Sequence, residues 1–60
     1  MKFQATITYY GSDGGALLET EQGPLNFLAA AMDAAKYEAC RVVGDLIGVT
    51  EIRVTMRVLP

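Results

Sequence analysis

Residues Pro24 to Val43 read PLNFLAAAMDAAKYEACRVV, and this stretch decides the fold because it is long and periodic enough for a helix. Gly23 suits the N-cap, and Pro24 suits the first helical position because its missing N–H would be unpaired there anyway. Gly44 can close the helix in the left-handed conformation, although Asp45, Leu46 and Ile47 could form a last irregular turn before Gly48. The sequence therefore predicts one central helix over residues Pro24 to Val43.

Two stripes run along this helix at steps of three and four residues. The first is expected to face the core and contains Leu25, Leu28, Met32, Ala35, Ala39, Val42 and Val43. The second lies on roughly the opposite side and contains Phe27, Ala30, Ala34, Tyr37 and Arg41. A small domain cannot bury both, so the second stripe is either solvated or a contact face for another protein.

The segments before and after the helix alternate between apolar and polar residues, which is typical of half-buried strands. Residues 2–10 and 49–59 alternate clearly, whereas residues 16–21 give a weaker pattern with an uncertain register. The glycine-rich segment 11–15 has the composition of a turn and predicts a hairpin between the first two strands. The order of elements is then β-β-α-β.

This order predicts an α+β fold in which one helix packs on a three-stranded antiparallel sheet of strand order 2-1-3. The whole chain, residues 1–60, is expected to form a single domain. The predicted core joins Phe3, Ile7, Ile52, Val54, Met56 and Val58 of the sheet to Leu25, Leu28, Met32, Ala35 and Val42 of the helix. The opposite face of the sheet is expected to be polar and open.

Sixty residues give a thin core, and such chains usually need a disulfide, a metal or a partner subunit. The single Cys40 cannot form an internal disulfide and is expected to be a buried apolar thiol, which favours a reducing, cytoplasmic compartment. We find no signal-peptide pattern and no segment apolar enough for a membrane span. A homodimer formed along the last strand is therefore a possible solution to the thin core.

Catalysis and cofactor binding have little support in the sequence. There is no histidine, and we find no metal-ligand, phosphate-loop or dinucleotide pattern. We therefore expect a protein that is not an enzyme and that uses no cofactor.

The distribution of charge is more informative than the net charge of -2. No basic residue occurs between Lys2 and Lys36, and the acidic residues in that interval are Asp13, Glu19, Glu21 and Asp33. They predict an acidic edge that could attract a protein with a basic surface, although carboxylates in a polar segment can also serve solubility alone.

The alternative is a small homodimeric regulatory or single-stranded nucleic-acid-binding domain that uses the open face of the sheet. Lys2, Arg53 and Arg57 would lie there beside Tyr10, and aromatic and basic side chains on a sheet can stack bases and follow a phosphate backbone. The isoelectric point of about 4.7 and Glu51 on the same face argue against this interpretation.

In size, acidity and architecture the chain resembles the small phage-encoded anti-CRISPR proteins, a group without a common motif. The resemblance implies an inhibitor in the host cytoplasm that occupies a basic nucleic-acid-binding surface of a nuclease complex, such as a CRISPR-Cas effector subunit. No residue role is transferred, because there is no motif to match. The predicted partner-binding residues are Asp13, Glu19, Glu21, Asp33, Phe27 and Tyr37.

Overall fold

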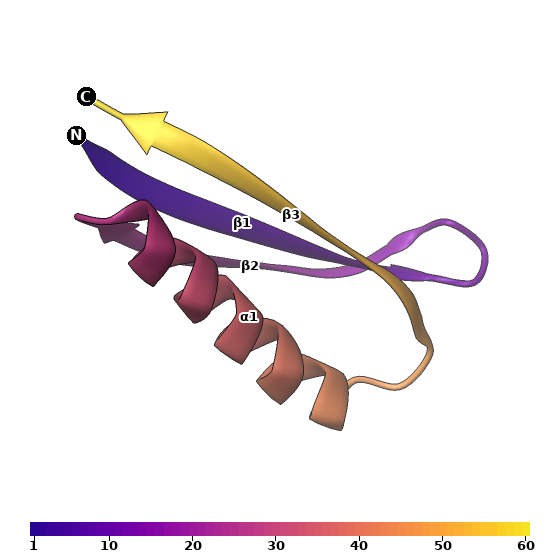
Figure 1. Cartoon of the computed structure of the whole chain (residues 1–60). Coiled ribbons are helices and arrows are strands. Elements are labelled where there is room, and N and C mark those ends of the chain that lie inside the picture. The colour runs from indigo at the N-terminus through magenta and orange to yellow at the C-terminus, as the bar shows by residue number, and fades with distance from the viewer.

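The structure, a computed structural model covering residues 1–60, contains three strands and one helix. Strands β1 (Lys2–Gly11) and β2 (Ala16–Leu25) precede helix α1 (Leu28–Asp45), and strand β3 (Val49–Leu59) ends the chain. The strands form one antiparallel sheet of order β2-β1-β3, and α1 covers one of its faces (Figure 1). The predicted α+β fold and strand order are confirmed. The helix is not long and apolar enough to cross a membrane.

A tight turn joins β1 to β2, as the glycine-rich segment predicts. The N–H of Gly11 donates to the carbonyl of Gly15 at 2.9 Å, and the N–H of Gly14 donates to the carbonyl of Gly11 at 3.0 Å. Asp13 accepts a further hydrogen bond from the N–H of Gly15 through Oδ1 at 2.9 Å. Asp13 therefore stabilises the turn that it occupies.

The register of the central strand β1 defines the two faces of the sheet. Ile7 lies opposite Thr20 of β2 and Val54 of β3, and residues that lie opposite each other in an antiparallel sheet point to the same face. The face toward α1 therefore contains Ala5, Ile7 and Tyr9 of β1, Leu18, Thr20 and Gln22 of β2, and Ile52, Val54, Met56 and Val58 of β3. The alternate residues form the open face.

The helix starts later than the sequence predicts. Pro24 and Leu25 belong to β2, and Phe27 is the N-cap residue of α1. Between Gln22 and Leu25 the strand has one residue more than β1, and Gly23 adopts a φ of 106° at this bulge. The prediction of a helix start at Gly23 and Pro24 was wrong because glycine and proline also suit a bulged edge strand.

The helix continues past Gly44 to Asp45, which is the alternative that the sequence leaves open. Gly44 lies within α1, and the helix ends at Asp45, where the N–H of Leu46 donates to the carbonyl of Val42 at 2.8 Å. The left-handed glycine is instead Gly48, with a φ of 89°, just before β3.

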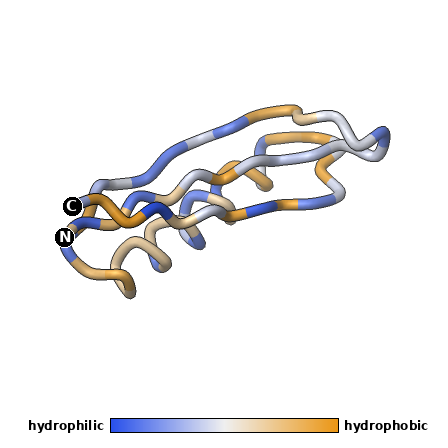
Figure 2. The backbone as a smooth tube through the Cα atoms, turned by 90° about the horizontal axis from the view of Figure 1, so that it is seen from above, coloured by the Kyte–Doolittle hydropathy of each residue, from blue (hydrophilic) through white to orange (hydrophobic).

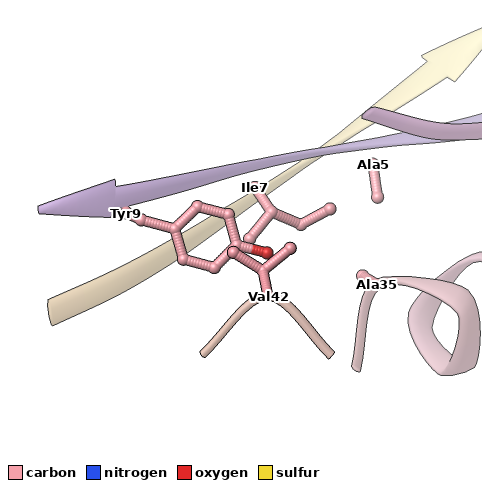
Figure 3. Close-up of a cluster of buried hydrophobic side chains, with 5 residues drawn as sticks. All are labelled: Ala5, Ile7, Tyr9, Ala35 and Val42. Atoms are coloured by element: carbon pink, nitrogen blue, oxygen red, sulfur yellow. The ribbon is translucent and has the colours of Figure 1, made fainter. Parts of the chain in front are cut away.

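The core is small and lies between β1 and α1. Its main cluster contains Ala5, Ile7 and Tyr9 of β1 with Ala35 and Val42 of α1. Tyr9 and Ile7 point toward Val42, and Ala5 faces Ala35 (Figure 3). Small alanines allow the helix and the strand to approach closely, and only 8 of the 60 residues are buried. The core is therefore as thin as the chain length predicts.

The helix is rotated and shifted relative to the predicted arrangement. It packs against β1 and β2 and has few contacts with β3, and its buried residues are Ala31, Ala35, Glu38 and Val42. Met32, placed in the core by the sequence analysis, is 57% exposed. Leu28 and Val43 are also exposed, and Leu25 lies in β2 outside the core cluster, so four members of the predicted core stripe do not belong to the core.

The side of β3 that points toward the helix is left uncovered, because α1 lies over β1 and β2. Apolar and polar residues alternate along this strand (Figure 2), but Ile52, Val54 and Val58 are exposed although they point to the helix side. The predicted burial of these three residues was wrong. Only Met56 and Val49 of β3 pack partly against the core.

Candidate interaction surfaces

Two carboxylates lie side by side on the free edge of the sheet formed by β2. Glu19 lies opposite Thr8 and Glu21 lies opposite Thr6, so both point to the open face, and both are exposed. Glu19 accepts a long hydrogen bond from the hydroxyl of Thr8 at 3.5 Å. Glu21 accepts one from the amide of Gln4 at 3.4 Å. We call this part of β2, which carries Glu19 and Glu21, the acidic strand.

The two salt bridges of the structure involve other carboxylates. On α1, Nη2 of Arg41 lies 2.7 Å from Oε1 of Glu38, and on β3, Nε of Arg53 lies 3.0 Å from Oε2 of Glu51. In each pair the pKa of the arginine is raised above its ordinary value. The larger cause is the hydrogen bond to the carboxylate, and Coulomb attraction to the same carboxylate is the second. Glu19 and Glu21 have no cationic partner within the chain.

The structure separates the residues that the sequence analysis grouped as a partner-binding site. Asp13 lies at the tip of the hairpin and is tied to the turn. Asp33 and Tyr37 belong to α1 and Phe27 is its N-cap, so all three lie on the helix side of the sheet, away from the acidic strand. Phe27 and Tyr37 are 72% and 74% exposed, but ten residues along a helix leave a net difference of about 80° between their directions. They therefore do not lie on one line along the helix, and neither belongs to the open face that carries the acidic strand.

The open face carries balanced charge. Its cations are Lys2, Arg53 and Arg57, and its carboxylates are Glu19, Glu21 and Glu51. The guanidinium of Arg53 lies 5.1 Å from the centre of the Tyr10 ring, so the one aromatic residue of this face already has a cationic neighbour. A phosphate backbone on this face would meet as many carboxylates as cations, which counts against the nucleic-acid interpretation.

A second surface is apolar and is formed by exposed side chains of α1 and of the helix-facing side of β3. It consists of large side chains that are 43–57% exposed on α1 and 40–58% exposed on β3, namely Leu28, Met32, Val43, Ile52, Val54 and Val58. We call this set the apolar face. Near one end it contains an open hollow of ≈ 380 Å³ lined by Ala39, Cys40, Val43 and Ile52. Cys40 is exposed, which corrects the expectation of a buried thiol.

Glu38 of α1 is a charged residue that is only 8% exposed. Its Oε2 accepts a hydrogen bond from Nε2 of Gln22 on β2 at 3.0 Å, and its Oε1 accepts one from Nε of Arg41 at 2.9 Å. Gln22 lies 16 residues away in the chain, so no local pattern indicates this contact. The hydroxyls of Tyr9 and Thr20 are buried without a hydrogen-bond partner.

Comparison with known proteins finds no matching family model, no similar curated protein and no similar solved structure. The structure contains no group of three or more histidine, cysteine or acidic side chains that could hold a metal ion.

Proposed function

We propose that the chain is a non-enzymatic protein-binding module whose acidic strand contacts a basic surface of its partner. The observation that carries the proposal is that Glu19 and Glu21 are adjacent, exposed and without a cation, on a strand whose outer edge is free. Exposed charges of one sign on neighbouring positions attract a surface of opposite charge and accelerate its association.

The cations of the open face do not neutralise the acidic strand. Arg53 and Arg57 lie on β3, and β1 separates them from β2, so they are roughly 10 Å away at a spacing of about 4.8 Å per strand. This distance is about one Debye length in physiological salt. Lys2 lies on β1, but it is four residues along that strand from Thr6, the residue opposite Glu21, which is about 14 Å at about 3.4 Å per residue. A partner that approaches the β2 edge therefore meets a local negative potential.

The partner class that fits this surface is a protein with a basic groove, and nucleic-acid-binding proteins have such grooves. In this proposal the module is an inhibitor that occupies the groove in place of a phosphate backbone. The resemblance to anti-CRISPR proteins supports the same class, with a subunit of a CRISPR-Cas effector complex as a specific candidate.

Charge reversal tests the proposal. The immobilised chain is incubated with an extract of the source cells at low salt, and the captured proteins are compared for the parent and for Glu19→Lys/Glu21→Lys. We expect the double variant to lose the captured partner, and we expect the parent to release it as the salt concentration rises. The matched control is Asp33→Lys/Asp45→Lys, which changes the net charge by the same amount on exposed helix positions.

Capture of the same partner by the acidic-strand variant and by the parent would contradict the proposal. A labelled single-stranded oligonucleotide provides the second readout. If the parent binds it and Arg57→Gln abolishes that binding, the open face is a nucleic-acid surface instead.

A further inference from the structure

The two edges of the sheet differ in how they are protected. The β2 edge carries Glu19, Glu21 and Pro24 and contains a bulge, all of which discourage pairing with another strand. The β3 edge is eleven residues long, contains no proline, and pairs with β1 without irregularity from Lys2 to Tyr10. An edge of this kind, beside exposed Ile52, Val54 and Val58, is available for a further strand.

We propose that a second copy of the chain pairs antiparallel along β3, around a two-fold axis at Val54. The inference does not depend on the acidic strand, which lies on the opposite edge of the sheet. A two-fold axis perpendicular to the sheet places opposed residues on the same face, so both helices lie on one side of a six-stranded sheet. The apolar faces of the two copies then become continuous.

The length of the strand selects the register. Val54 is the midpoint of Val49–Leu59, so the axis at Val54 is the one that pairs all eleven residues of β3 with the second copy. On the helix side, Val54 then lies opposite Val54 of the second copy, and Ile52 lies opposite Met56. Side chains that are exposed in the single chain thereby gain apolar neighbours.

The charges on the open face support the same register. Glu51 lies opposite Arg57 of the second copy, and the two-fold axis repeats this pair. Arg57 has no salt bridge within the chain, whereas Glu51 can accept from Arg53 of its own strand and from Arg57 of the second copy.

The neighbouring registers are worse on two counts. An axis at Thr55 places Arg53 opposite Arg57, and an axis at Arg53 places that residue opposite itself. Like charges directly opposite each other destabilise a strand pair, and each shift also leaves the ends of β3 unpaired. Length and charge therefore favour the axis at Val54. Because β3 is complementary to itself about this axis, the strand that fits this edge is β3 of a second copy.

Two charge variants test the register by sedimentation velocity. In Glu51→Arg, the introduced arginine faces Arg57 of the second copy, and the two-fold axis repeats this repulsion. In Arg57→Glu, the introduced glutamate faces Glu51 in the same way. We expect each variant to dimerise at least ten-fold more weakly than the parent. An equimolar mixture restores the dimer, because both cross-strand pairs then join a glutamate to an arginine. All affected side chains are exposed, and far-UV circular dichroism of each variant controls for the fold.

The restored dimer in the mixture cannot be explained by a change within one chain. The proposal is overturned if the parent remains monomeric at millimolar concentration. It is also overturned if either variant alone dimerises as well as the parent, or if the mixture stays monomeric while both variants are folded. Undiminished dimerisation of either variant alone would indicate that copies associate through another surface or register.

Discussion

Glu38 connects the helix to the sheet through its side chain. It is nearly buried, and it accepts hydrogen bonds from Gln22 of β2 and from Arg41 of its own helix. A buried carboxylate is tolerated because both of its oxygens have partners. The hydrogen bond between Glu38 and Gln22 thereby links α1 to β2, whereas α1 has few contacts with β3.

Removal of this carboxylate has a predictable cost. We expect Glu38→Ala to lower the free energy of unfolding by about 1–3 kcal/mol, because the amide of Gln22 loses its partner in a partly buried site. Urea denaturation measures the change. Asp33→Ala is the control, since Asp33 is exposed on the same helix, forms no hydrogen bond or salt bridge within the chain and lies away from the β3 edge, so its loss should change the free energy of unfolding by no more than about 0.5 kcal/mol. Equal effects of the two substitutions would argue against a structural role for Glu38.

The elements differ in how clearly the sequence indicates them. Strict alternation places β3 correctly at Val49–Leu59 and β1 within one residue, because a period of two has few competing interpretations. The start of α1 was misplaced because Gly23 and Pro24 are compatible with a helix start and with a bulged edge strand. The rotation of α1 was also missed. Hydrophobic periodicity favours large side chains such as Met32 for the core, whereas close packing against Ala5 favours the small side chain of Ala35.

Two glycines of opposite role provide a test of the element boundaries. Gly44 lies in α1 with open space around the position of a Cβ atom, so Gly44→Ala should stabilise the chain by about 0.4–1 kcal/mol. Gly23 has a φ of 106°, and a Cβ atom there would lie 2.8 Å from the carbonyl oxygen of Phe3. Gly23→Ala should therefore destabilise the chain by about 1–3 kcal/mol, and urea denaturation of both variants measures the two changes. If Gly44→Ala proved the more damaging change, the helix would not continue through this residue.

The candidate surfaces were only partly predictable from the sequence. The missing basic residues before Lys36 indicate an acidic region, but only the strand register shows that Glu19 and Glu21 share a face and that Asp33 lies elsewhere. The apolar face could not be predicted, because it arises from the lateral position of α1 over β1 and β2. That position includes the contact between Gln22 and Glu38, which joins residues distant in the chain.

In the whole molecule, each edge of the sheet is proposed to make a different contact. The β2 edge is acidic and is proposed to contact a basic partner, whereas the β3 edge and the apolar face are proposed to join two copies. A dimer of this kind carries an acidic strand at each outer edge, so it can contact two partners or two positions on one partner. It also adds burial to a chain in which only 8 of 60 residues are buried.

The dependence of the melting temperature on protein concentration tests whether association stabilises this thin fold. If two copies bury the β3 edge and the apolar face, a hundred-fold increase in concentration should raise the melting temperature by roughly 10 °C for a domain of this size. Arg57→Glu should lose most of this dependence, and its equimolar mixture with Glu51→Arg should regain it. A parent melting temperature that stays constant over the hundred-fold range would contradict the account, because the chain would then be equally stable with its apolar face exposed.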